Sequence, residues 1–285
     1  MKLFWSTLLM GCCIIISCGN DTHGQETPVT SPWVDVDTPS DVLPVNTLIG
    51  KGWKLAFSDE FNDGRVNFNK WVIKDESRGA RPDLGIKEWF FKPENVVEAD
   101  GDLVLKVTKV GDDVMHCSSV YSNGKYYMKY GYAEARIKLA DMNSAALTAF
   151  WLQSNSMSKV DGTGNDGAEI DVFESAYLAD EVISTIHIDG YGADHQEKNF
   201  RYATPGVFEG YHVWGVLWNE NSVKIYYDGE FMAEFDEKWV PRVEEFLYLS
   251  TVATFSGQGD FKGKPADSSL SEARFDYVRV WTNDK

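Results

Sequence analysis

The sequence predicts an all-β fold, with a single β-sandwich of about 235 residues following residue 46. Short runs of alternating apolar and polar residues recur from Trp53 onward, and turn residues separate them. The same stretch contains no long amphipathic helical pattern and no internal repeat. With 285 residues, 43% of them hydrophobic, the chain is long enough to bury a large core in one such sandwich.

The N-terminal segment has the features of an export signal. Lys2 precedes a short apolar run, Leu3–Ile16, which is too short to span a bilayer comfortably. The small and aliphatic residues that lead to Cys18 resemble the lipobox of bacterial lipoproteins. This resemblance implies removal of residues 1–17, a lipid on the Cys18 thiol, and a place in the cell envelope, at the outer membrane or cell surface. A plain secretory signal, in which Cys18 is incidental, is the alternative.

A linker is expected between this signal and the folded domain. Residues 18–46 are rich in Pro, Thr, Ser and Asp and have no sustained periodicity, which is typical of a flexible, extended segment. The domain then comprises residues 47–285. The only cysteine within it is Cys117, so we expect no intrachain disulfide and a small buried side chain at this position.

Six alternating runs are expected to be strands of the sandwich. They are Trp53–Phe57, Leu103–Thr108, Tyr130–Leu139, Val182–Ile188, Val223–Tyr227 and Phe275–Trp281. Asp100-Gly101 and Asp228-Gly229 mark turns, and strands on both sides of the second indicate a tight hairpin. Two polar stretches are expected to be loops, namely Ser77–Gly85 and Asn155–Asn165.

An acidic strand lies at the centre of the domain, where three carboxylates occur within six residues among apolar neighbours. Side chains alternate along a strand, so Glu169 and Asp171 share one face, whereas the odd offset of Glu174 would turn it away. One extra residue, a β-bulge near Val172 or Phe173, would return Glu174 to the same face, and such bulges are common beside active sites.

Aligned carboxylates repel one another and are disfavoured in strands, so a chain that keeps them can be using them chemically. Two carboxyl groups about 5–5.5 Å apart are what a retaining glycosidase requires, one as nucleophile and one as acid and base. The alternative is an ordinary strand whose exposed face happens to be acidic. Spacing alone does not decide between these interpretations.

Charge and composition exclude some partners. The net charge is −17 and the sequence has no basic block, which argues against nucleic acid as a partner. The same acidity disfavours a strongly anionic substrate unless positive charge is concentrated locally. Aromatic residues make up 14% of the chain, enough for a core and a ligand groove.

Several separate stretches resemble one family, glycoside hydrolase family 16, the retaining endo-β-glycanases that include laminarinases, agarases, porphyranases and carrageenases. The resemblance covers about residues 52–281. In chain order, the matching stretches are Ser58–Asn62, Lys92–Val97, Asp100–Leu103, Tyr130–Lys138, Ala149–Leu152, the acidic strand Gly167–Ser175, Trp218, Val223–Gly229 and Asp276–Val280. The acidic strand matches the bulged form of the family signature, with two residues between the aspartate and the second glutamate.

The resemblance implies a concanavalin-like jelly roll of two curved antiparallel sheets, with a substrate cleft on the concave face. It implies that Glu169 is the nucleophile, that Glu174 is the general acid and base, and that Asp171 holds the nucleophile and tunes the protons. Glu174 must then be protonated near neutral pH, which burial and a neighbouring negative charge favour. The expected partner is a polysaccharide, the expected state a monomer, and catalysis is expected to use no cofactor.

Four further residues are candidate sugar contacts by this resemblance. Trp151 and Trp89 are expected to stack on sugar rings, although core packing is the common role of a tryptophan. His187 is expected to lie in the cleft on the next strand, and Asn95 to bond sugar hydroxyls; for a lone histidine, a structural role is the alternative. A structural Ca²⁺ on the convex face would use Glu60 and Asp276, because oxygen ligands suit this ion.

The substrate is less well determined by the sequence. Glu88-Trp89 and Pro93–Asn95 are similar to laminarinases, whereas Leu147–Ser154 is similar to agarases and porphyranases, and the extra Trp and Pro of laminarinases before the Phe-Trp pair are missing. Arg78, Arg81 and Arg201 could bind the sulfates of a galactan, but the net charge argues against this. We expect internal cleavage of a neutral β-glucan or galactan; a host O-glycan is a third candidate, and a non-catalytic, lipid-anchored glycan-binding protein is the alternative function.

Overall fold

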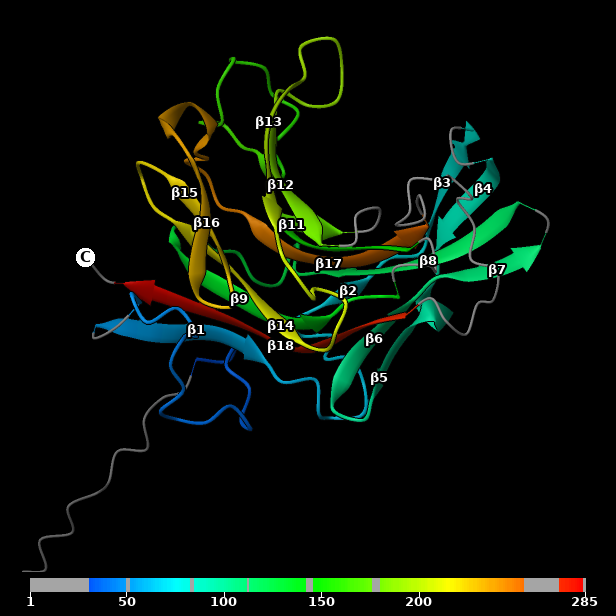
Figure 1. Ribbon diagram of the computed structural model, residues 1–285, viewed down its shortest axis with the longest axis horizontal. Coiled ribbons are helices and arrows are strands. Elements are labelled where there is room, and N and C mark those ends of the chain that lie inside the picture. The colour runs from blue at the N-terminus through cyan, green and yellow to red at the C-terminus, as the bar shows by residue number, and fades with distance from the viewer. Residues whose placement is uncertain are drawn as a thin grey trace, which may run out of the picture. The chain divides into compact units, whose positions relative to one another are not determined.

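The computed structural model shows two stacked β-sheets (Figure 1). It describes residues 31–49, 52–82, 85–111, 113–141, 146–175, 180–253 and 272–283. The signal segment and Cys18 lie outside the described residues. The described residues from Ser31 onward belong to one compact unit.

An eight-stranded sheet forms one layer. Its order is β16-β15-β14-β9-β18-β6-β5, and β1 pairs with β18. Its strands are β1 (Trp53–Asp59), β5 (Val96–Ala99), β6 (Asp102–Lys106), β9 (Gly131–Lys138), β14 (His212–Trp218), β15 (Val223–Tyr227), β16 (Glu230–Phe235) and β18 (Glu272–Asn283).

A ten-stranded sheet forms the other layer and carries the acidic strand. Its order is β13-β12-β11-β10-β17-β8-β4-β3, and β2 and β7 pair with β8. Its strands are β2 (Val72–Ile73), β3 (Glu76–Arg81), β4 (Ile86–Phe91), β7 (Thr108–Gly111), β8 (Val114–Tyr121), β10 (Ala146–Gln153), β11 (Glu169–Ser175), β12 (Glu181–Ile188), β13 (Gln196–Ala203) and β17 (Phe246–Ala253).

The helical elements of the described residues are short 3₁₀ turns, η2 (Pro93–Asn95) and η4 (Glu237–Trp239). No helix in the described part of the chain is long and apolar enough to cross a membrane.

Both predicted turns are two-residue hairpin loops. Asp100-Gly101 joins β5 to β6 with φ angles of 57° and 82°, and Asp228-Gly229 joins β15 to β16 with φ angles of 49° and 84°. Two consecutive positive φ angles define the turn whose twist matches that of the flanking strands, and Asp-Gly adopts it readily. The turn predictions are therefore confirmed.

The core between the sheets is rich in aromatic side chains, and one pair connects the acidic strand to the opposite layer. Phe173 on β11 stacks on Trp214 on β14 with ring centroids 4.2 Å apart and planes 19° apart, and both rings are fully buried. Burial of each ring stabilises the fold by roughly 2–3 kcal/mol. Because Phe173 is held in this way, the backbone of β11 has a fixed position beneath the cleft.

The expected linker is too long at its C-terminal end, because residues 31–49 pack on the domain. The carboxylate of Asp35 lies 3.5 Å from Lys70 Nζ, and both side chains are almost fully buried. The backbone N–H of Val45 donates to Glu134 Oε2 at 3.0 Å, and Trp33 packs against the core. A boundary at residue 47 was wrong: buried polar contacts, which a polar composition does not reveal, attach residues 31–46 to the sandwich.

Two details of the ten-stranded sheet also differ from expectation. Most of the loop predicted at Ser77–Gly85 is instead part of β3, which pairs with β4 at the edge of the sheet. An edge strand needs no buried face, so a polar stretch containing Gly79 can still pair. In addition, β4 runs parallel to β8, whereas only antiparallel pairs were expected.

Candidate active site

A β-bulge in β11 brings the three carboxylates to one cleft. The register of β11 with β10 and with β12 shifts between Asp171 and Glu174. Val172 and Phe173 are consecutive in sequence, yet both are fully buried in the core. Two consecutive side chains on the same face of a strand require the extra residue of a bulge. The side chains of Glu169, Asp171 and Glu174 consequently line the same cleft, and the predicted bulge is confirmed.

The carboxylate of Glu169 accepts hydrogen bonds on both of its oxygens. Gln153 Nε2 donates to Oε2 at 2.7 Å, and the hydroxyl of Tyr191 donates to Oε1. Burial raises the pKa of Glu169, whereas these two donors and the nearby His187 favour its ionised form. The two fixed hydrogen bonds orient the carboxylate and suit it to act as a nucleophile.

The side chain of Asp171 is enclosed between the other two acids. It is 4% exposed, and its Oδ2 lies 3.3 Å from Nε2 of His187 on β12. Burial raises the pKa of Asp171 well above its usual range, and the negative charges of Glu169 and Glu197 raise it further. A proton is thus readily held within this group of acids, whose titrations are linked.

Glu174 has the protonation expected of a general acid. Burial, followed by the charges of Asp171 and Glu169, raises the pKa of Glu174 to about 8. At neutral pH Glu174 therefore retains its proton, whereas Glu169 has two hydrogen-bond donors that favour its ionised form. One acid and one base in a shared cleft is the combination that glycosidic bond cleavage requires.

The cleft has a volume of about 420 Å³ and is lined by both apolar and charged side chains. The residues lining it are Lys74, Arg78, Trp89, Phe91, Leu147, Ala149, Trp151, Gln153, Glu169, Asp171, Glu174, Tyr191, Tyr248, Ser250 and Val252. They come mainly from β10, β11, β17, β4 and β3, so the cleft crosses the ten-stranded sheet.

Trp151 lies in the cleft as predicted, in a fixed orientation. Its ring stacks on Tyr248 with centroids 3.7 Å apart and planes 3° apart, and its Nε1 donates to Ser250 Oγ at 3.1 Å. The pair forms a rigid aromatic platform on the floor of the cleft, opposite Asp171 in the β10–β11 register.

Trp89 also lines the cleft, and its ring contacts the cationic side chain of Arg78. The guanidinium of Arg78 lies 5.4 Å from the centre of the Trp89 ring, within the range of a cation–π contact. Lys74 Nζ lies over Tyr248 at 5.3 Å, and both cations contact the single carboxylate of Glu76. This end of the cleft therefore carries an excess of positive charge.

Two other predicted cations do not line this cleft. Arg201 is exposed on β13 and lies 4.0 Å from Glu181, and Arg81 is at the end of β3. Of the three arginines proposed from the sequence to bind sulfate groups, Arg78 is the one that lines the cleft.

Asn95 was wrongly expected to contact sugar. Its side chain is 4% exposed, and its Nδ2 donates to the carbonyl oxygens of Lys106 and His116 and to Thr108 Oγ1. Asn95 therefore ties η2 to neighbouring strands and has no donor available for a ligand.

The two carboxylates expected to bind Ca²⁺ are each paired with an arginine instead. Arg279 contacts both carboxylate oxygens of Glu60 at 2.9 and 2.7 Å, and Arg136 contacts Asp276 at 2.6 Å. Neither acid belongs to a metal-compatible group of His, Cys, Asp and Glu among the described residues. Cationic partners far away in sequence satisfy these acids, which local motifs could not indicate.

Tyr191, Gln153 and Lys74 were missed by sequence reasoning. Gln153 could have been found, because it follows Trp151 at strand spacing and therefore shares its face. Tyr191 lies in the turn between β12 and β13, where no periodic pattern applies. Its contact with Glu169 depends on how that turn folds back over the cleft.

Comparisons with known proteins agree with this geometry. Residues 53–283 match the family described as β-porphyranase A–D, GH16 domain. The chain is 27% identical to glucan endo-1,3-β-glucosidase A1 of Niallia circulans, covering 88% of this chain but only 41% of that protein. It is 24% identical to β-porphyranase B of Zobellia galactanivorans, covering 91% and 92%. The laminarinase catalytic domain of Thermotoga maritima superposes with a TM-score of 0.65 at 25% identity, covering 82% of this chain and 100% of that one.

Proposed function

The chain belongs to glycoside hydrolase family 16, and from this membership we propose that it is a retaining endo-β-glycanase that hydrolyses internal β-glycosidic bonds of a polysaccharide. The family and the jelly-roll sandwich expected from the sequence are confirmed by the match over residues 53–283 and by the similar solved structure. The observation that carries the proposal is the bulge of β11, which gathers three carboxylates in one cleft.

We assign the chemical steps to two of these acids. Glu174, protonated at neutral pH, gives its proton to the oxygen of the leaving sugar while Glu169 attacks the anomeric carbon. The glycosyl group is then bonded to Glu169, whose negative charge is lost, so that Glu174 can remain ionised and take a proton from the attacking water. Water then displaces Glu169 and releases the product.

Asp171 is assigned a supporting role between the two. Its pKa is raised by burial and by the charge of Glu169, so it can share a proton with its neighbours as the charge on Glu169 changes. Nε2 of His187 on β12 lies 3.3 Å from the carboxyl group of Asp171.

For the substrate, we propose a galactan backbone that carries anionic groups. Support comes from Lys74 and Arg78, two cations that line the cleft and, among the described residues, share the one carboxylate of Glu76, in a chain of net charge −17. Lys74 follows β2, which pairs with β8. β8 lies three strand spacings from β11, a distance on the order of 15 Å. An anionic group near Lys74 would therefore bind a few sugars from the scissile bond. The match to the β-porphyranase A–D domain agrees with this substrate class.

A neutral β-1,3-glucan is the second candidate. It is favoured by the resemblance to glucan endo-1,3-β-glucosidase A1 and to the Thermotoga maritima laminarinase. Trp151, stacked on Tyr248, would offer an aromatic platform to either sugar.

One digestion experiment tests both the activity and the substrate. Reducing ends are measured after incubation with porphyran, agarose, carrageenan and laminarin. We expect release from porphyran, with products of intermediate length first. Glu169→Gln should abolish release but retain glycan binding, because an amide cannot attack carbon; unchanged release in this variant would refute the mechanism. A wild-type protein that binds a glycan but cuts none would instead be the lipid-anchored binding protein considered above.

The cations provide the test of specificity. Arg78→Gln should raise KM for an anionic galactan about tenfold and leave KM for laminarin nearly unchanged. Arg242→Gln is the matched control, because Arg242 bonds Asn165 and Glu237 outside the cleft. An equal effect of Arg78→Gln on both polymers would argue against anionic recognition.

We further propose that the enzyme is anchored in the cell envelope by a lipid on Cys18, on the basis of the lipobox-like sequence before it. Metabolic labelling with a radioactive fatty acid should mark the wild-type chain. Loss of the label in Cys18→Ser would support the anchor, and persistence of the label would contradict it.

A further inference from the structure

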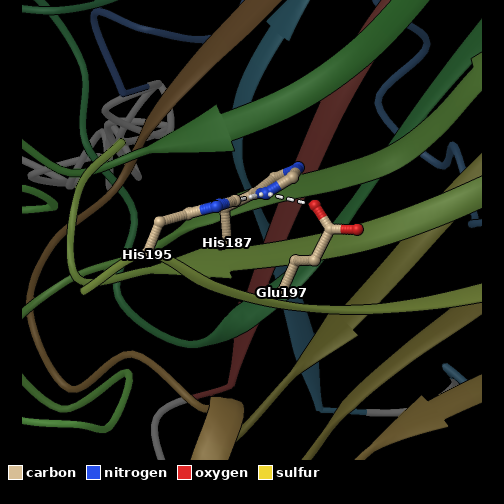
Figure 2. A group of neighbouring side chains, drawn as sticks. All are labelled: His187, His195 and Glu197. Atoms are coloured by element: carbon tan, nitrogen blue, oxygen red, sulfur yellow. Dashed lines mark hydrogen bonds and ion pairs between the residues drawn. The ribbon is translucent and has the colours of Figure 1, made fainter. Parts of the chain in front are cut away.

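We propose that His187, His195 and Glu197 form a binding site for a divalent transition-metal ion of the Zn²⁺ type, beside the cleft. The three side chains point toward one another (Figure 2). The site goes beyond the proposed hydrolysis, since neither Glu169 nor Glu174 is among its ligands, and its existence can be tested by binding alone.

The spacing of the ligand atoms suits one ion. Nδ1 of His187 lies 2.9 Å from Nε2 of His195 and 3.5 Å from Oε2 of Glu197, and the three ligand atoms lie within 4.8 Å of one another. Ligands bound tetrahedrally to Zn²⁺ at 2.0–2.1 Å lie roughly 3.3 Å apart. The two separations from His187 Nδ1 therefore lie within a few tenths of an ångström of that value, and the third is short enough for a side-chain adjustment to complete the site.

The donor types indicate which ion would bind. Two imidazoles and one carboxylate form a common ligand set for zinc, with a fourth position open to water. Imidazole nitrogen suits Zn²⁺, Cu²⁺ and Ni²⁺, whereas Ca²⁺ and Mg²⁺ prefer oxygen ligands. The site should therefore discriminate strongly against Ca²⁺ and Mg²⁺.

The opposite nitrogen of His187 already has a partner that suits a metal ligand. Nε2 lies 3.3 Å from the buried Oδ2 of Asp171, and Nδ1 is the nitrogen near the other two ligands; the tautomer with its proton on Nε2 would bind the ion. A metal-binding histidine usually donates its second ring N–H to a carboxylate in this way, which fixes both the tautomer and the ring orientation.

The backbone holds the ligands in place without blocking access. His187 and Glu197 are directly opposite each other in the β12–β13 ladder, and His195 immediately precedes β13. His187 and His195 are half-buried and Glu197 is exposed, so an ion can enter from solvent. A rigid ladder with an open side is a suitable support for such a site.

The ion would also restrain a residue of the catalytic cleft. The ring of Tyr191 lies beside both histidines, with centroids 5.6 Å from His187 and 5.1 Å from His195, while its hydroxyl bonds Glu169. Because His195 ends the turn that carries Tyr191, an ion that joins His195 to the strands would hold Tyr191 against Glu169.

Isothermal titration of chelator-treated protein with Zn²⁺ tests the site. We expect one saturable ion per chain with micromolar or tighter affinity, and no comparable binding of Mg²⁺ or Ca²⁺. His195→Gln and Glu197→Gln should each weaken Zn²⁺ binding at least tenfold. The matched control is His116→Gln, which removes a histidine paired with Glu94 elsewhere and should leave Zn²⁺ binding unchanged.

Two further measurements make the result decisive. Co²⁺ in the same site should give the intense visible absorption of tetrahedral coordination, and hydrogen exchange of residues 189–195 should slow when Zn²⁺ is added. Unchanged circular dichroism spectra would show that the variants are folded. Absence of saturable Zn²⁺ binding, or binding that survives both variants, would overturn the site, and unchanged exchange would overturn the restraint on Tyr191.

Discussion

The hydroxyl of Tyr191 donates a hydrogen bond to Oε1 of Glu169, from a turn 22 residues farther along the chain. Gln153 donates to the other oxygen, Oε2, at 2.7 Å. Burial alone would favour the protonated form of Glu169, which cannot attack a sugar. The two donors oppose this effect and favour the carboxylate form, so the geometry of a surface turn bears directly on the nucleophile.

Tyr191→Phe should therefore shift the acid limb of the activity profile. Loss of the hydroxyl removes a hydrogen bond that favours ionised Glu169, so its pKa rises and the acid limb of kcat/KM moves to higher pH. A hydrogen bond to a charged group contributes about 1.5–3 kcal/mol, so the acid limb should move upward by roughly 1–2 pH units. Profiles of kcat/KM against pH measure this shift.

The control for this change is Tyr211→Phe, which removes a tyrosine hydroxyl that donates to Asp102 at 2.6 Å, away from the cleft residues. That variant should retain the wild-type profile. An acid limb that stays in place in Tyr191→Phe would show that the tyrosine does not tune Glu169.

Glu174→Gln should stabilise the protein at alkaline pH while inactivating it. Burial and neighbouring charges raise the folded-state pKa of Glu174 from 4.5 to about 8. Between these values the unfolded chain has released the proton and the folded chain retains it, so the free energy of unfolding falls as pH rises through this window. The variant lacks this loss and should be more stable than wild type by about 1–3 kcal/mol at pH 8.

Urea unfolding at pH 4.5 and pH 8 measures this difference. The difference in the free energy of unfolding between the variant and wild type should be small at pH 4.5 and should increase toward pH 8. Glu230→Gln, at an exposed position on β16, is the control and should show no such trend. A variant that gains nothing at pH 8 would mean that Glu174 is not held protonated by its surroundings.

Asp35→Asn should destabilise the whole domain, because residues 31–49 are part of the fold. The Asp35 carboxylate lies 3.5 Å from buried Lys70 and accepts hydrogen bonds from the backbone N–H groups of Asp37 and Glu60. Removing one charge of a buried pair leaves the other uncompensated, although Asp59 still lies 3.8 Å from Lys70. We expect a loss of about 1–3 kcal/mol in the free energy of unfolding.

Thermal unfolding of Asp35→Asn beside Asp37→Asn measures this loss. The side chain of Asp37 is exposed, so its substitution should leave the midpoint nearly unchanged. Equal midpoints for the two variants would support the original expectation of a loose linker up to residue 46.

The sequence was sufficient to predict features that depend on local pattern. Alternating apolar residues located β1, β6, β9, β12, β15 and β18, although the run expected at Leu103–Thr108 ends at Lys106, and Asp-Gly pairs located two hairpins, because strand period and positive φ are local properties. The bulge of β11 was predicted for a similar reason, since an odd offset between acids that must share a face requires one extra residue.

The failures concern partners that lie far apart in sequence. Asn95, Glu60 and Asp276 have residue types that bind sugars or cations, but buried carbonyls and arginines from distant strands satisfy them. The role of Tyr191 was missed for the same reason, because only the folded turn brings it to Glu169. A local pattern shows which chemistry a side chain can perform, whereas the tertiary structure determines whether its donors and acceptors are free.

The most direct test of the account is the anomeric configuration of the first product, followed by proton NMR during the opening minutes of hydrolysis. Glu169 and Glu174 acting in two successive displacements should give the β-anomer first, with the α-anomer appearing only by mutarotation. An α-anomer at the start would mean a single displacement by water, with the two carboxyl groups too far apart for Glu169 to be the nucleophile, and would contradict the mechanism proposed for this cleft.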